Sequence, residues 1–148
     1  MRVRPSALTL LYLFSIGALD WVIPEMRVHF PGQFLIASAI GTTGLILILL
    51  SIRGSYRTKS TVLSDAMDQS TALVIDGLYQ ISRNPMYLGM AAIILGAGLA
   101  LATWITLPVL TAFVWIISTF QIKPEEQALE TIFGDAFSQY ISQVRRWI

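Results

Sequence analysis

The chain has 148 residues, of which 55% are hydrophobic and 13% are charged, and its formal net charge is +1. Soluble domains usually carry about 25% charged residues, so this balance indicates an integral membrane protein of one domain. The chain has no cysteine and a single histidine, His29, which excludes disulfides and thiolate chemistry and argues against a metal centre. The small net charge and the lack of a long basic run give no support to a nucleic-acid partner.

Four apolar stretches have about the length that a membrane-spanning helix needs. They cover residues 6–23, 33–52, 85–102 and 105–122. The last two are separated by only Thr103 and Trp104, so we expect them to form a tight antiparallel hairpin. The predicted fold class is therefore all-α, an integral membrane protein with about four transmembrane helices. Small residues four apart, in the pairs Ala37/Gly41 on the second helix and Ala92/Gly96 on the third, suggest close packing of helices, since such spacing lets backbones approach in a bilayer.

The first stretch has alternative interpretations. It could be a cleaved signal peptide, but Ser15-Ile16-Gly17 makes a poor cleavage site, so a retained span is preferred. Asp20 lies near its end, where an acid is costly unless it is satisfied. We expect Asp20 to lie at the outer interface, reachable by water, with a structural role. The alternative function is a small four-helix proton-coupled transporter that uses Asp20.

The basic residues predict the orientation of the chain. Four spans place nine of the ten on one side of the bilayer and leave Arg27 on the other; the nine are Arg2, Arg4, Arg53, Arg57, Lys59, Arg83, Lys123, Arg145 and Arg146. Basic residues favour the cytoplasmic side of a membrane. Both termini are therefore predicted to be cytoplasmic, at the inner or plasma membrane if the protein is bacterial.

Two polar segments on that side are predicted to converge. The loop of residues 53–84 has an apolar second half that can fold back onto the bundle, and it ends with Arg83 and Asn84 at the start of the third span. Free backbone N–H groups at a helix start suit an anionic group. Because the third and fourth spans are antiparallel, Arg83, Asn84 and Tyr87 should face the polar residues that end the fourth, namely Gln121, Lys123, Glu125 and Glu126.

The segment after the fourth span predicts an amphipathic helix over residues 124–147, interrupted near Gly134. Pro124 suits a helix start, and Glu125 and Glu126 suit the first turn, where negative charge complements the helix dipole. Apolar residues recur at helical spacing and should lie against the membrane or the bundle; they are Leu129, Ile132, Phe133, Phe137, Tyr140, Ile141 and Val144.

Two blocks of the sequence resemble a known family. Gly77-Leu78-Tyr79 followed by Arg83-Asn84-Pro85-Met86-Tyr87-Leu88-Gly89 resembles the G-P-Y…R-H-P-x-Y-x-G motif of the isoprenylcysteine carboxyl methyltransferases. The Glu125-Glu126-x-x-Leu129 run and the later Gly134, Phe137, Tyr140 and Val144 are similar to that family's E-E-x-x-L…G…Y…Y…V tail. Phospholipid methyltransferases share the broader superfamily. The resemblance covers about residues 71–146.

The resemblance implies an S-adenosylmethionine-dependent methyltransferase that acts on a lipophilic or membrane-embedded small substrate among membrane lipids, without a metal. It implies a cofactor cavity lined by Gly77, Tyr79, Arg83, Asn84, Tyr87, Leu88, Glu125 and Glu126. Glu125 is the candidate general base, and Gln121 is the candidate residue beside the reaction centre.

Three departures from the family pattern affect what the resemblance implies. Leu78 replaces a proline and Asn84 replaces a histidine. Gln121 stands where the family tends to carry an arginine, which leaves the methyl acceptor open. A substitute for that charge is also left open, with Arg57, Arg145 and Arg146 as candidates.

Two further interpretations compete with this one. A non-catalytic membrane scaffold predicts that Arg83 and Glu125 both tolerate alanine. A membrane sterol reductase would share a related cavity and bind NADPH, but the chain is short for that role and lacks a basic cluster for the extra phosphate.

Overall fold

The computed structural model of the chain describes residues 4–57 and 73–148. Within these ranges the elements are helical, apart from one isolated bridge between Arg27 and Thr103. In chain order they are α1 (Pro5–Val22), η1 (Pro24–Met26), α2 (Gln33–Arg57), η3 (Gly77–Gln80), α3 (Pro85–Ala100), α4 (Thr106–Ile116), the π-helical segment η4 (Ile117–Ile122), α5 (Lys123–Phe133) and α6 (Asp135–Gln143). The all-α prediction is confirmed.

Three stretches are long and apolar enough to cross a membrane, and they are Pro5–Val22, Gln33–Ser55 and Thr106–Phe133. α3 is apolar but has only 16 residues, so the chain has three to four candidate membrane-spanning helices. α3 ends two residues earlier than predicted because residues 101–105 form the turn to α4. In this turn Ala102 has a φ of 57°, and the Thr103 N–H donates to the carbonyl of Gly98 at 3.2 Å.

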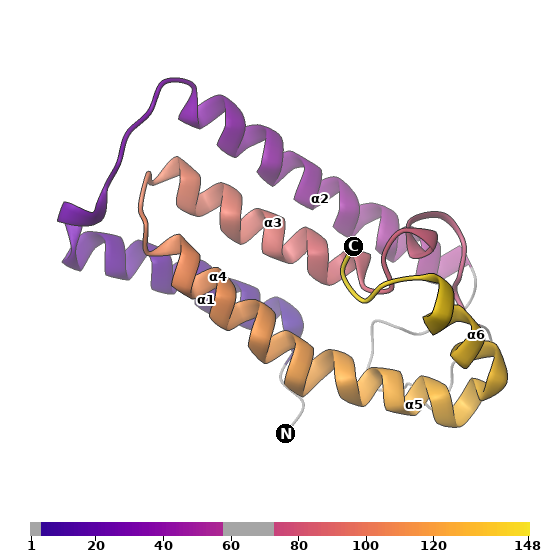
Figure 1. Cartoon of the computed structure of the whole chain (residues 1–148). Coiled ribbons are helices and arrows are strands. Elements are labelled where there is room, and N and C mark those ends of the chain that lie inside the picture. Colours follow the sequence, from indigo (N-terminus) through magenta and orange to yellow (C-terminus); the bar gives the residue numbers. More distant parts are fainter. Residues whose placement is uncertain (1–3, 58–72) are drawn as a thin grey trace.

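The chain runs back and forth through α1, α2, α3 and α4 (Figure 1). The start of α1, the end of α2, the start of α3 and the end of α4 consequently lie at one end of the bundle, as the basic residues predict. Arg2, Lys59 and the centre of the predicted loop, residues 58–72, lie outside the described residues. The side of a membrane that this end faces stays a prediction.

The fourth helix differs from the prediction, because α4, η4 and α5 form one continuous helix from Thr106 to Phe133. Pro124 therefore lies inside a helix rather than at the start of a new one. A proline there lacks an N–H and crowds the carbonyl one turn earlier, and the wider π-helical turn that precedes it accommodates this loss. The interruption near Gly134 is confirmed, since Gly134 has a φ of 50° and separates α5 from α6.

α2 and α3 pack with their backbones in close approach. A Cβ built on Gly89 would lie 2.6 Å from the carbonyl oxygen of Gly44, and one built on Gly96 would lie 2.9 Å from that of Ala37. Small residues permit this contact, and in a bilayer such packing replaces the hydrophobic effect as the force between helices. The close helix packing predicted from the spacing of Ala37, Gly41 and Gly96 is confirmed, and the structure adds that the two helices approach each other.

The other helices meet in an apolar core. Ile16 of α1, Ile94 of α3, Phe113 of α4 and Ile117 of η4 are fully buried against one another. Tyr12 stands edge-on to Phe113, with 5.5 Å between the ring centres, an arrangement that aromatic rings favour. This core fixes α4 and η4 beside α3, and so fixes the polar residues that follow them.

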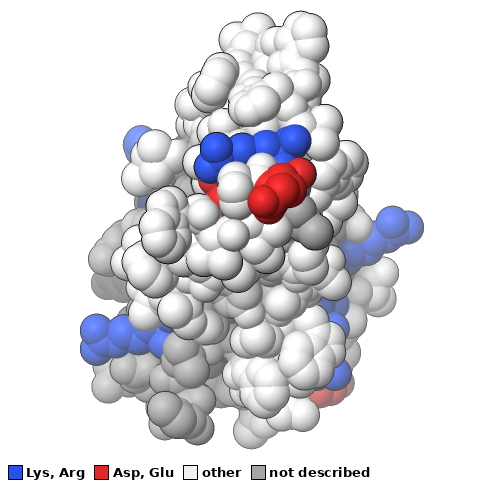
Figure 2. All heavy atoms as spheres, turned by 90° about the vertical axis from the view of Figure 1, so that its left-hand side faces the viewer, with Lys and Arg blue, Asp and Glu red and all other residues white. Residues whose placement is uncertain are grey.

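Asp20 differs from the prediction, because it is buried and only 3% exposed. It forms an ion pair with Arg27, whose Nε and Nη2 donate to the two carboxylate oxygens at 3.0 and 2.6 Å. Figure 2 faces this end of the molecule, where basic and acidic side chains lie together on a mostly uncharged surface. The Asp20–Arg27 pair lies at the end of the bundle away from the start of α3. The transporter alternative is not favoured, because Asp20, the acid that it would use, is already paired with Arg27.

We expect Asp20→Asn to lower the melting temperature by a few degrees and to leave ligand binding at the other end of the bundle unchanged. The amide keeps the shape of the side chain but weakens a charge-assisted pair of hydrogen bonds. Thermal unfolding in detergent and ligand titration of the same preparation check both parts. Loss of ligand binding by a folded Asp20→Asn protein would contradict a purely structural role.

Candidate active site

The segment that leads into α3 is held by two tyrosines. Gly77, with a φ of 63°, begins η3 in a conformation that favours glycine. The Tyr79 hydroxyl lies 3.2 Å from the Ser55 hydroxyl of α2, and the Tyr140 hydroxyl of α6 donates to the carbonyl of Tyr79 at 2.6 Å. Burial raises the pKa of both tyrosines, so both hydroxyls stay protonated at neutral pH and serve as neutral hydrogen-bonding groups.

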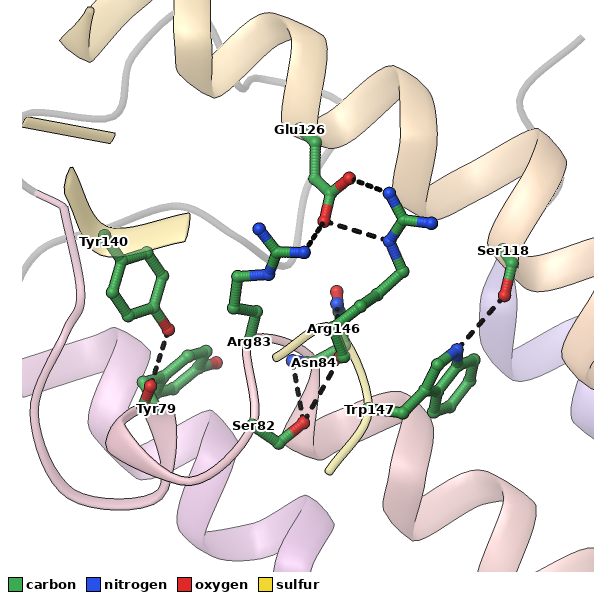
Figure 3. Close-up of polar contacts among 9 residues, drawn as sticks. All are labelled: Tyr79, Ser82, Arg83, Asn84, Ser118, Glu126, Tyr140, Arg146 and Trp147. Carbon is green, nitrogen blue, oxygen red and sulfur yellow. Dashed lines mark hydrogen bonds and ion pairs between the residues drawn. The ribbon is translucent and has the colours of Figure 1, made fainter. Parts of the chain in front are cut away.

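Arg83 and Arg146 share the carboxylate of Glu126 (Figure 3). Arg146 donates from Nε to Oε1 at 3.2 Å and from Nη2 to Oε2 at 2.5 Å. Arg83 reaches the same carboxylate only through Nη2, which lies 3.2 Å from Oε1. Hydrogen bonds to Glu126 raise the pKa of Arg146. The cluster therefore contains two positively charged guanidinium groups and one negatively charged carboxylate.

Arg83 has two donors that this carboxylate does not use. Its Nε and Nη1 atoms are buried and have no hydrogen-bond partner among the described residues. A buried, charged donor without a partner is costly, and such groups in proteins usually have a specific reason. Nε and Nη1 lie on different edges of the guanidinium, so they are two separate donors, and each can donate to an oxygen of an anionic group. This part of the cluster is suited to an anionic ligand.

A second polar cluster forms beside the first. The Tyr87 hydroxyl of α3 donates to Oε1 of Glu125 at 2.7 Å, and the amide of Gln121 donates to the same oxygen. Gln121 belongs to η4 and Glu125 to α5, so the π-helical segment aligns these two side chains. π-helical turns of this kind are frequent at functional sites.

The structure separates the predicted site residues into two groups. Arg83, Tyr87, Gln121, Glu125 and Glu126 are brought together by direct contacts. Three of the remaining predicted residues hold the backbone around the site: Gly77 forms the turn, Tyr79 bridges α2 and α6, and the Asn84 amide donates to the carbonyl of Arg146 at 3.0 Å. Leu88 is half-buried on α3 and Lys123 is exposed, and neither contacts these clusters through a hydrogen bond among the described residues.

The amphipathic helix was predicted to reach residue 147, but α6 ends at Gln143, where Val144 turns extended, and residues 144–148 form an irregular C-terminal strap. The backbone N–H of Arg83 donates to the carbonyl of Arg145 at 3.0 Å, and the indole N–H of Trp147 donates to the Ser118 hydroxyl at 3.2 Å. Short, irregular segments like this have no periodicity to reveal their contacts. The sequence suggested Arg146 only as one of three candidates to replace the family arginine that is absent at Gln121. It did not indicate Ser55 or Ser118.

Comparisons with known proteins support the predicted resemblance. The model of the phospholipid methyltransferase family matches residues 33–136. A protein-S-isoprenylcysteine O-methyltransferase from Schizosaccharomyces pombe is 26% identical over 113 residues, which are 76% of this chain and 43% of the relative. Protein-S-isoprenylcysteine O-methyltransferase B from Arabidopsis thaliana is 29% identical over 151 residues, or 97% of this chain and 77% of that protein.

An uncharacterized protein from Haemophilus influenzae is 38% identical over 63 residues, 43% of this chain and the whole of that protein. This chain thus spans less than half of the yeast relative and about three quarters of the Arabidopsis one. The family match extends from α2 to the start of α6 and includes the residues of both polar clusters except Arg146. The chain therefore belongs to the phospholipid methyltransferase family, and the predicted membership in this group of membrane methyltransferases is confirmed.

Proposed function

We propose that this protein transfers a methyl group from S-adenosylmethionine to a lipophilic acceptor at the end of the bundle where α3 begins. The observation that carries the proposal is the pair of buried donors, Nε and Nη1 of Arg83, that lack a partner among the described residues. S-adenosylmethionine has a carboxylate, and a buried, charged N–H donor without a partner suits such a group. Membership in a methyltransferase family supports the same cofactor.

The residues present fit this cofactor in two respects. Arg83 would hold its carboxylate, while Glu126 holds Arg83. Glu125, which accepts hydrogen bonds from Tyr87 and Gln121, would bind the ammonium group or the ribose hydroxyls. When bound, the cofactor supplies an electrophilic methyl group on a sulfonium.

The residues of the chain would then position the reactants more than they activate them. An acceptor that is already ionised needs no base, whereas an amine or thiol must first lose a proton. Glu125 is the candidate base for the second case, and Gln121 would orient it without adding charge. Alignment of acceptor, methyl carbon and sulfur can supply much of the rate enhancement.

The surroundings of the site support a lipophilic acceptor. The polar clusters lie at the start of α3 and the end of η4, and α3 and the α4 helix that leads into η4 are largely apolar. Side chains of α4 and η4 near the site, such as Trp115 and Phe120, are exposed and would contact lipid. Two relatives are named for isoprenylcysteine, which also supports an acceptor that carries a lipid.

Calorimetric titration with S-adenosylhomocysteine tests the proposal, first in detergent and then in lipid nanodiscs. We expect saturable binding to the wild type and weaker binding to Glu125→Ala, because the variant removes a carboxylate that Tyr87 and Gln121 hold in place. Transfer of radiolabel from S-adenosylmethionine to a lipid extract would then identify the acceptor. A folded wild-type protein that binds no S-adenosylhomocysteine in either medium would refute the proposal.

A further inference from the structure

We propose that Arg146 is a positioning residue, which occupies Glu126 so that the Arg83 guanidinium keeps unpaired donors for the carboxylate of a bound ligand. This inference rests on the proposed function and extends it to the C-terminal strap. The family match ends at residue 136, so it covers Arg83 and Glu126 but not the strap.

The geometry of Glu126 carries the inference. Arg146 binds both carboxylate oxygens, through Nε at 3.2 Å and Nη2 at 2.5 Å. An arginine and a carboxylate tend to pair through two parallel hydrogen bonds, and here Arg146 has taken that arrangement. Arg83 is left with one contact, from Nη2 to Oε1, and its Nε and Nη1 stay available to a ligand.

The charges lead to the same conclusion. With Arg146 in place, the three side chains carry a net positive charge, which favours an anion. Without Arg146, the carboxylate of Glu126 could turn to form a two-bond pair with Arg83, and the net charge of the cluster would fall to zero. Both changes would weaken the binding of a carboxylate at Arg83.

The strap allows the side chain of Arg146 to be tested separately from its backbone. Its carbonyl accepts hydrogen bonds from the Asn84 amide at 3.0 Å and from the Ser82 hydroxyl at 3.4 Å. The indole of Trp147 is held by Ser118. These contacts remain when the Arg146 side chain is shortened, so Arg146→Ala should leave the strap in place.

The experiment compares two ligands that differ in the group Arg83 would bind. S-adenosylhomocysteine carries the carboxylate, and 5′-methylthioadenosine lacks the whole amino acid portion. Both are titrated calorimetrically into the full-length wild type, Arg146→Ala and Arg145→Ala. Arg145→Ala is the matched control, because it removes the same charge from the neighbouring residue, whose side chain is exposed.

We expect Arg146→Ala to bind S-adenosylhomocysteine about tenfold more weakly, the loss typical of a hydrogen bond to a charged group. Its affinity for 5′-methylthioadenosine should stay within about twofold of the wild type, as should both affinities of Arg145→Ala. In an Arg83→Ala background, Arg146→Ala should cause no further loss. If Arg146→Ala does not fold, Arg146→Lys replaces it, with an intermediate loss expected for S-adenosylhomocysteine alone.

Other outcomes separate this inference from the proposed function. Equal weakening of both ligands would show a general structural role for Arg146 and overturn the inference. Unchanged S-adenosylhomocysteine affinity in Arg146→Ala, with a wild type that binds, would also overturn it and leave the proposed function intact. A wild type that binds neither ligand would refute both.

Discussion

Arg83→Ala is expected to weaken the binding of S-adenosylhomocysteine by about 100-fold, the largest effect of any single replacement at the site. A hydrogen bond from a buried guanidinium to a carboxylate contributes up to about 3 kcal/mol, and each 1.4 kcal/mol is a factor of ten. The variant also removes a positive charge from the cluster, so that Glu126 is then paired with Arg146 only among the described residues. Calorimetric titration measures the change in affinity.

Two further variants make the Arg83 result specific. Arg83→Lys keeps the charge and can still contact Glu126, but a lysine cannot hold Glu126 and a ligand from the fixed donors of one planar group, so an intermediate loss is expected. Arg53→Ala removes a charge from an exposed position on α2 near the same end of the bundle and should bind as the wild type does. Equal affinities for Arg83→Ala and the wild type would contradict the assigned role and favour a non-catalytic scaffold.

Gly89→Ala is expected to destabilise the helix bundle by about 1–3 kcal/mol, the range of overpacking in a well-packed core. The new methyl group would lie 2.6 Å from the Gly44 carbonyl and 2.8 Å from a side-chain carbon of Ile48. The first of these is a backbone atom, so α2 and α3 must move apart. The free energy of unfolding, measured by titration with a denaturing detergent, checks this prediction.

Gly41→Ala is the matched control for that replacement. Gly41 belongs to the same helix pair, but a Cβ built on it has no heavy atom within 4 Å. In a helix, alanine is favoured over glycine, so the variant should be as stable as the wild type or more so. Equal losses for Gly89→Ala and Gly41→Ala would show that helix flexibility, rather than the close approach of α2 and α3, determines the stability.

Movement of α2 away from α3 should also disturb the site. Ser55 lies near the end of α2, and its hydroxyl meets that of Tyr79, which precedes α3. The spacing of small residues predicted that each of these helices packs closely, but it did not name the partner. The sequence could not predict the Ser55–Tyr79 contact, because a serine near a helix end has many ordinary uses, such as bonding a carbonyl of its own helix.

The sequence by itself determined the class of this protein and the two blocks from which its site is built. Hydropathy over about 20 residues locates apolar helices, because a bilayer leaves the backbone few other conformations. Neighbouring helices run in opposite directions, so the start of the third span lies beside the end of the fourth. This brings Arg83 and Tyr87 near Glu125 and Glu126. The family membership followed from the residues at these same two places.

Only the tertiary structure decided which side chains pair and which are left with open donors. Residue spacing could not distinguish Glu125, which binds Tyr87 and Gln121, from Glu126, which binds Arg83 and Arg146. The continuous helix through Pro124 depends on a π-helical turn, and the burial of Asp20 depends on Arg27 seven residues later. Such contacts are determined by packing between distant segments, which local periodicity does not encode.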